Sequence, residues 1–228
     1  MALILNIETA SPVCSVALAL DGSVMGIKET TEQSDHSSIL TVFIDELMQE
    51  QGTSLHSLDA IAISAGPGSY TGLRIGAATA KGLCYALSKP LLVIDSLESL
   101  ASGMYKNHPL IGGIYCPTID ARRDEIYYGL FEEGKIIMET SRNIILDPGF
   151  LAPYRLHKNL VVGGSGVSKC RKIATLSFAE FDETTLPSAK WMATLSESKW
   201  TQREFQDIFS FEPFYIKPAF ISFNNTFS

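Results

Sequence analysis

The order of apolar and polar positions predicts that the chain opens with three short strands. Residues 3–7, 13–20 and 23–29 are rich in apolar side chains, and polar residues separate them. Asp21 and Gly22 stand between the second and third runs, and both tolerate the positive φ angles of a tight turn. We therefore expect a β-hairpin that joins strands 13–20 and 23–29.

Helical and extended patterns then alternate up to about residue 105. Apolar residues recur at helical spacing from Ile39 to Met48, and Gly52 ends that pattern. The expected elements are a helix over about 37–50, a strand over 60–64, a glycine-rich turn over 66–72, a helix over 71–87, a strand over 90–94 and a helix over 96–105. Strands and helices that alternate in this way are typical of an α/β fold.

The second half of the chain is less regular. Polar residues 106–109 end in a proline and mark a lobe boundary. The expected elements beyond it are strands over 112–118, 125–132, 135–141 and from 160, helices over 167–172 and 187–198, and a last strand or tail over 213–217. We therefore expect two lobes, residues 1–106 and 107–228, with a tail that can return to the first lobe.

Composition and charge narrow the classes of function. The 228 residues are enough for a full core without disulfide staples, and the net charge of −7 argues against a surface that binds nucleic acid directly. The four cysteines lack the spacing of a zinc site, and Cys14 and Cys84 lie in apolar patterns, so we expect these two to be buried thiols in a reducing compartment. The sequence shows neither a signal-peptide pattern nor an apolar run of the ~20 residues that span a membrane, and we expect a cytoplasmic protein without a membrane partner.

The glycine-rich turn over 66–72 allows two interpretations. Gly66 and Gly68 permit unusual backbone angles, and Ser69 or Thr71 can cap the helix that follows, so its amide groups could bind an anion or a nucleotide. The alternative is a tight strand-to-helix junction without a ligand. The turn lacks the lysine of a Walker A loop and the frame of a nucleophile elbow.

The helix after this turn carries small residues four positions apart, Gly72, Gly76 and Ala80. Glycine inside a helix costs about 1 kcal/mol relative to alanine, so the pattern indicates that another backbone comes close. The neighbour is either a helix of the same chain or a helix of a partner protein, and the apolar helix over 37–50 suits both cases.

Other polar groups give weaker indications. The four histidines are far apart in sequence and show no metal-ligand spacing. The charged run Asp120–Glu125 is either a solvated loop or a contact for a partner or a phosphate. Gly163–Gly166 is either a plain turn or part of an adenosine pocket.

Several motifs together resemble the TsaB family, also called YeaZ. They are Ile4–Thr9, the GPGSYTGLRIG run of Gly66–Gly76, Ser96–Glu98 and Asp120–Arg123, in that order, and more weakly Gly163–Gly166 and Pro213–Lys217. The glycine run is the most specific of them, and the motifs cover the chain to about residue 130.

The resemblance implies an actin-like ATPase (ASKHA, ribonuclease H-like) fold with a reduced second lobe. It also implies a partner of TsaD, the subunit that transfers threonylcarbamoyl to N6 of adenosine 37 in tRNA. A TsaE-like ATPase and a second copy of the chain are further implied partners, and tRNA is bound only through the complex. No cofactor of its own is expected, and ATP or ADP would enter at the level of the complex.

The resemblance also implies the absence of a metal site. Ser96 and Leu100 stand where the catalytic relative carries metal-binding histidines, and neither side chain can replace an imidazole. Glu8 replaces the aspartate that is usual in the first turn. We therefore expect no catalytic residue and no metal ligand in this chain.

Two sets of candidate residues follow. The expected partner interface consists of Leu40, Phe43, Ile44, Leu47, Gly72, Leu73, Ile75, Gly76, Thr79, Ala80 and Leu83. The candidates for contact with a nucleotide or anion are Glu8, Gly68, Ser69, Thr71, Asp120, Arg122, Gly164 and Ser165. The leading hypothesis is a non-catalytic partner subunit, and the alternatives are a stand-alone ATPase or small-molecule kinase of the same fold and, with little support, a peptidase.

Overall fold

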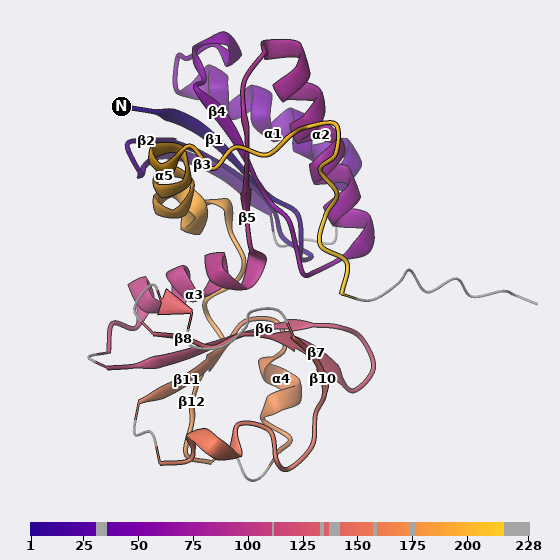
Figure 1. Cartoon of the computed structure of the whole chain (residues 1–228), viewed down its shortest axis with the longest axis vertical. Helices are drawn as coiled ribbons and strands as arrows, with labels where there is room; N and C mark the ends of the chain where they lie inside the picture. Colours follow the sequence, from indigo (N-terminus) through magenta and orange to yellow (C-terminus); the bar gives the residue numbers. More distant parts are fainter. Residues whose placement is uncertain are drawn as a thin grey trace, which may run out of the picture.

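The structure is a computed structural model, and it describes residues 1–30, 36–110, 112–132, 135–136, 142–156, 159–173 and 177–216. Two β-sheets form two lobes, one above the other in Figure 1. Residues 137–141 of the predicted strand 135–141, and Lys217 at the end of the predicted tail 213–217, lie outside the described residues.

The first lobe is built on a mixed sheet with strand order β3-β2-β1-β4-β5. Its elements are β1 (Leu3–Glu8), β2 (Cys14–Leu20), β3 (Ser23–Thr30), α1 (His36–Glu50), a short 3-10 turn (Leu55–Ser57), β4 (Ala60–Ser64), α2 (Tyr70–Leu87), β5 (Leu91–Ile94) and α3 (Ser96–Asn107). The first three strands pair antiparallel, whereas β4 pairs parallel with both β1 and β5. The predicted hairpin turn is confirmed, since Asp21 and Gly22 both have positive φ angles.

The alternation of side chains along β4 separates the two faces of this sheet. Ile61 and Ile63 belong to the core beneath α1 and α2, whereas Ala60 and Ala62 belong to a second cluster that includes Met192 near the chain's C-terminal helix. Successive side chains of a strand point to opposite faces. The helices α1 and α2 therefore cover one face of the sheet, and the C-terminal helix covers the other (Figure 1).

The second lobe repeats part of this plan on a sheet with order β10-β7-β6-β11-β12, to which β8 and β9 are attached. Its elements are β6 (Ile114–Asp120), β7 (Glu125–Tyr128), β8 (Phe131–Glu132), β9 (Lys135–Ile136), β10 (Arg142–Ile145), a 3-10 turn (Ala152–Tyr154), β11 (Leu160–Gly163), α4 (Val167–Cys170) and β12 (Glu180–Asp182). As in the first lobe, antiparallel pairing at one side gives way to parallel pairing at the other. A 3-10 turn stands between β10 and β11, where the first lobe has α1 between β3 and β4, so the second lobe is the smaller one.

The chain then returns to the first lobe. A 3-10 turn (Ala189–Met192) and α5 (Ala193–Gln202) lie against the sheet of the first lobe, in the region where the sequence predicted a helix over 187–198. The hydroxyl of Ser188 donates a hydrogen bond of 2.6 Å to the carboxylate of Glu29 on β3, and the amide of Ala189 donates one of 3.0 Å to Ser15 on β2. These two hydrogen bonds attach the chain to the first lobe just before α5 begins.

Candidate functional site

The stripe of Gly72, Gly76 and Ala80 lies against the chain's own first turn, not against a partner. A Cβ atom on Gly72 would be 2.1 Å from the carbonyl oxygen of Thr9, and one on Gly76 would be 2.2 Å from the Thr9 hydroxyl oxygen. Such distances are far below van der Waals contact. The glycines are therefore needed so that α2 can approach the end of β1, and their assignment to a partner interface is wrong.

The same correction applies to most of the predicted interface. Buried in the core of the first lobe are Leu40, Ile44, Leu47, Gly72, Leu73, Gly76 and Ala80. Phe43, Ile75, Thr79 and Leu83 are only half-buried, and Phe43, Ile75 and Leu83 pack at the edge of that core. Residues spaced by three and four on a helix share a face, so the glycine stripe and the apolar stripe beside it point the same way.

A second stripe of small residues on α2 faces outward. Ala78, Gly82 and Ala86 are spaced by four and exposed, and a Cβ atom added to Gly82 would have no neighbour within 4 Å. Half-buried Ile75 lies on the same side of the helix. We call Ile75, Ala78, Gly82 and Ala86 the outer face of α2. The sequence contained this spacing as well, but only the position of the sheet shows which stripe is open.

The glycine turn joins three parts of the first lobe. The amide of Ser69 donates a hydrogen bond of 2.6 Å to the carbonyl of Ala10, and a Cβ atom on Gly68 would be 2.2 Å from that oxygen. Gly66 and Ser96 exchange two bonds, from Gly66 N to the Ser96 hydroxyl at 3.1 Å and from Ser96 N to the Gly66 carbonyl at 2.9 Å. The turn therefore holds β1, α2 and α3 together, which favours the interpretation as a structural junction.

The helix begins with the cap that the sequence predicted at Ser69. Its hydroxyl accepts a hydrogen bond of 3.3 Å from the amide of Gly72, and Thr71 is exposed in the first turn of α2. The amides of Ser69 and Gly72 already donate hydrogen bonds within the chain. They are thus committed to the fold, and an anion at this turn would compete with internal acceptors.

Glu8 is fully buried at the end of β1. Desolvation raises the pKa of this carboxyl from 4.5 to about 7, although the amide of Ala10 and the hydroxyl of Ser64 act in the opposite direction. One carboxyl oxygen accepts a hydrogen bond of 2.6 Å from Ala10 N, and the other has no hydrogen-bond partner among the described residues. A carboxyl with a pKa of about 7 is only partly ionised near neutral pH, which weakens it as a ligand for Mg²⁺.

The second lobe brings together Asp120, Arg122 and Ser165. The hydroxyl of Ser165 accepts a hydrogen bond of 3.1 Å from the amide of Asp120, whose carboxylate accepts one of 2.6 Å from the amide of Arg122. Lys169 on α4 also reaches this carboxylate, at 2.6 Å, and the sequence did not indicate it. Gly164 packs against the backbone of Thr118, where a Cβ atom would be 2.3 Å from the carbonyl oxygen. The carboxylate of Asp120 is therefore paired within the second lobe.

The candidate residues for nucleotide contact thus form two separate groups. Glu8, Gly68 and Ser69 belong to the first lobe, whereas Asp120, Arg122, Gly164 and Ser165 belong to the second. Within the described part of the chain, no group of three or more histidine, cysteine, aspartate or glutamate side chains could hold a metal ion.

Ser96 and Leu100, which stand where the catalytic relative carries histidines, both have structural roles in this chain. The Ser96 hydroxyl accepts a hydrogen bond from the glycine turn, and Leu100 is fully buried.

All four cysteines are free and buried, as expected for Cys14 and Cys84, and desolvation raises the pKa of the Cys84 thiol to about 12. In the described residues, no helix has the length and apolar character needed to cross a membrane.

Comparisons with known proteins agree with this architecture. Residues 22–201 match the family model described as "TsaD: tRNA N6-adenosine threonylcarbamoyltransferase". The tRNA threonylcarbamoyladenosine biosynthesis protein TsaB of Haemophilus influenzae is 27% identical, over 94% of this chain and 93% of that protein. TsaB of Escherichia coli is 33% identical over 57% of this chain, a match that spans 54% of the E. coli protein.

Solved structures show the same relationship. YeaZ from Pseudomonas aeruginosa superposes with a TM-score of 0.80 at 28% identity, and covers 95% of this chain and 100% of that one. An activator of 2-hydroxyisocaproyl-CoA dehydratase from Clostridium difficile shares the fold, with a TM-score of 0.54 and 9% identity over 90% of this chain and 98% of that one. The predicted actin-like α/β fold is confirmed by these neighbours. The chain belongs to the TsaB (YeaZ) family of tRNA threonylcarbamoyladenosine biosynthesis proteins.

Proposed function

We propose that this chain is a non-catalytic subunit that binds a TsaD-type threonylcarbamoyltransferase and supports formation of N6-threonylcarbamoyladenosine in tRNA. The binding surface in this proposal is the outer face of α2. The site of action is the cytoplasm, where free thiols such as the four buried cysteines stay reduced.

The observation that carries the proposal is the exposed glycine in α2. Gly82 lies in the interior of a helix, where glycine costs about 1 kcal/mol relative to alanine. Among the residues that the structure describes, nothing lies near enough to require it, unlike at Gly72 and Gly76. Two helices approach to interaxial distances of 8–10 Å, and small residues allow the shorter end of that range. A helix of another protein is the partner that would make use of Gly82.

The match to the TsaD family model supports the choice of partner. It spans residues 22–201 and so includes both α1 and α2. A protein of the same family carries helices equivalent to these two and can present them to the same face. Two related folds can then pair about a pseudo-two-fold axis, as identical subunits pair about a true one. A homodimer through the same face is the competing assembly, and a TsaE-like ATPase would join the heterodimer.

Three side chains support the non-catalytic part of the proposal. Burial raises the pKa of Glu8 to about 7, Asp120 is paired with Lys169, and Ser96 is bonded to Gly66. A kinase or ATPase needs an ionised carboxylate to hold Mg²⁺ at the phosphates. The net charge of −7 further favours a division of labour in which another subunit holds the tRNA.

The test is a reconstitution with the transferase of the same organism, threonylcarbamoyl adenylate and unmodified tRNA. Modified adenosine is measured by mass spectrometry of the digested tRNA, and ATP hydrolysis is measured in parallel. We expect no product and no ATP turnover with this chain alone, and more product when the chain is added to the transferase. Product or ATP turnover with this chain alone, or an unchanged yield of the transferase, would contradict the proposal.

A further inference from the structure

The last described segment, Gln206–Ile216, runs along the first lobe without forming a helix or an extended sheet strand; we call it the C-terminal strap. The amide of Gln206 donates a hydrogen bond of 2.9 Å to the carbonyl of Leu91 on β5. Phe211 is 6% exposed and belongs to the core beneath α1 and α2, and Lys81 of α2 donates a hydrogen bond of 3.1 Å to its carbonyl. The strap is therefore anchored on the first lobe.

The end of the strap lies on the glycine turn. The amide of Phe214 donates a hydrogen bond of 2.7 Å to the carbonyl of Ala65, which directly follows β4. The carbonyl oxygen of Phe214 is so close to Gly66 that a Cβ atom there would be 2.7 Å from it. The rings of Tyr215 and Tyr70 have their centroids 4.8 Å apart. These contacts place the strap at the junction between β4 and α2.

Ile216 then leaves the first lobe and packs against the cluster between α3 and the second sheet. That cluster contains Leu97 and Leu100 of α3 together with Ile119 and Tyr127 of the second lobe. Figure 1 shows the strap, in yellow, crossing from α5 to α2 and ending at the level where the two lobes face each other. Three consecutive residues thus connect the glycine turn of the first lobe to the core shared by α3 and the second sheet.

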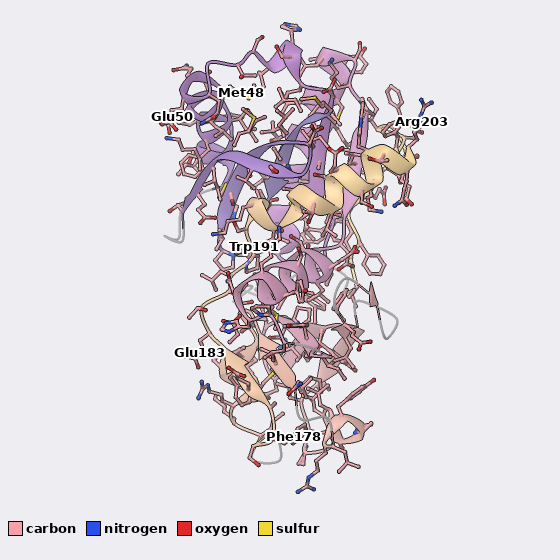
Figure 2. All side chains as sticks on the ribbon, turned by 90° about the vertical axis from the view of Figure 1, so that its left-hand side faces the viewer. Met48, Glu50, Phe178, Glu183, Trp191 and Arg203 are labelled. Atoms are coloured by element: carbon pink, nitrogen blue, oxygen red, sulfur yellow. The ribbon has the colours of Figure 1, made fainter. Side chains whose placement is uncertain are left out.

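Two further contacts hold α3, which packs against the second sheet, to the rest of the first lobe. One is the Gly66–Ser96 pair at the start of α3. The other is Trp191, whose ring fills the space beside Gly103, where a Cβ atom would be 2.8 Å away. Figure 2 shows Trp191 at the level where the lobes meet, at the start of the helix that crosses the first lobe. The lobes are further joined through α3 itself, whose buried side chains share a core with the second sheet.

We propose that Phe214, Tyr215 and Ile216 form an internal tie that fixes the angle between the two lobes. The tie is anchored by Phe211 on one side and by the apolar contact of Ile216 on the other. It holds the glycine turn, and with it the start of α2, at one orientation relative to the second lobe. A chain without these three residues keeps its anchored first lobe but has a wider range of angles.

The test measures the distance between spin labels on the two lobes in paired truncations. The labels are attached at Gln49→Cys on α1 and Lys172→Cys in the second lobe, since both positions are exposed and the native cysteines are buried. One chain ends at Ile216 and keeps the tie, and the other ends at Pro213 and lacks it. We expect the full chain and the chain ending at Ile216 to share one narrow distance distribution, and the chain ending at Pro213 to give a broader or shifted one.

A full-length pair of variants gives a second measurement. Ile216→Asp removes the apolar contact with the second lobe, whereas Phe209→Asp alters a side chain that is 77% exposed and contacts only Tyr85 of α2 among the described rings. Hydrogen exchange at the Ser96 amide reports opening of the junction. Loss of the contact of the half-buried Ile216 predicts roughly tenfold faster exchange in Ile216→Asp and no change in Phe209→Asp.

Three outcomes would overturn the tie. They are unchanged distances in the chain ending at Pro213, a changed distribution already in the chain ending at Ile216, or equal exchange rates in the two aspartate variants.

Discussion

The buried carboxyl of Glu8 makes the stability of the fold depend on pH in a definite direction. In the folded chain its pKa is raised from 4.5 to about 7, because burial disfavours the charged form. In the unfolded chain the carboxyl is solvated and keeps its ordinary pKa. Between these two pH values the folded state therefore binds more protons than the unfolded state, and the free energy of unfolding falls as the pH rises.

The size of this effect follows from the two pKa values. Each factor of ten in proton affinity corresponds to 1.36 kcal/mol, so the stabilisation present below pH 4.5 is reduced by about 3.4 kcal/mol once the pH is well above 7. About 2.5 kcal/mol of that loss falls between about pH 5 and about pH 8.5. This is a large share of the 5–15 kcal/mol that stabilises a typical domain.

The assay is urea unfolding of the wild type and of Glu8→Gln across that pH range. Glutamine is close in size, can accept the hydrogen bond of Ala10 N, and does not titrate. Other titrating groups affect both proteins alike, so the difference between the two curves isolates Glu8. We expect the Gln variant to gain about 2.5 kcal/mol relative to the wild type from about pH 5 to about pH 8.5. Parallel curves would refute the reasoning, because they would mean that Glu8 has the same pKa in both states.

Two further predictions concern the glycines and the cap. Gly76→Leu should destabilise the fold by roughly 2 kcal/mol or more, because a Cβ atom at that position already overlaps Thr9, whereas Gly82→Ala should stabilise it by about 0.5–1 kcal/mol. Thermal unfolding of both variants checks this pair, and equal effects would contradict the packing. Asp95→Ala should cost about 1 kcal/mol, because the carboxylate accepts hydrogen bonds from two amides in the first turn of α3. Urea unfolding without a measurable loss would show that this cap contributes nothing.

Local patterns predicted much of the fold. The hairpin at Asp21 and Gly22 and the limits of α2, expected over 71–87 and found at Tyr70–Leu87, were readable because turn residues and helical spacing act over short distances. The boundaries of β6 were displaced, from an expected 112–118 to Ile114–Asp120. Strand ends depend on pairing with distant segments, which a single run of residues does not show.

The orientation of α2 could not be predicted in the same way. Gly72 and Gly76 have the spacing of a helix–helix contact, and only the position of Thr9, more than sixty residues earlier, shows that the turn after β1 fills that space. The ion pair of Lys169 with Asp120 has the same origin, since the residues are far apart in sequence. Small residues indicate a close neighbour without identifying it.

The sequence indicated that the tail can return to the first lobe, but not where α5 and the C-terminal strap lie on it. The helix α5 has few apolar residues at helical spacing, and the C-terminal strap has no repeating pattern at all. Their positions follow from individual side chains, such as Met192 and Phe211, that fill places in a core built by other elements.

The central claim is that the outer face of α2 binds a TsaD-type transferase, and calorimetric titration of that transferase with three forms of this chain tests it most directly. The forms are the wild type, Gly82→Leu on the outer face, and Ser198→Leu at an exposed position of α5 on the opposite side of the sheet. The leucine at 82 has free space in the isolated chain, so folding is preserved while a close helix is kept away. We predict that the wild type and Ser198→Leu bind with equal affinity and that Gly82→Leu binds at least about tenfold more weakly, the loss expected when a central contact of an interface is disrupted. Equal affinity of all three forms, or no binding by the wild type, would contradict the account.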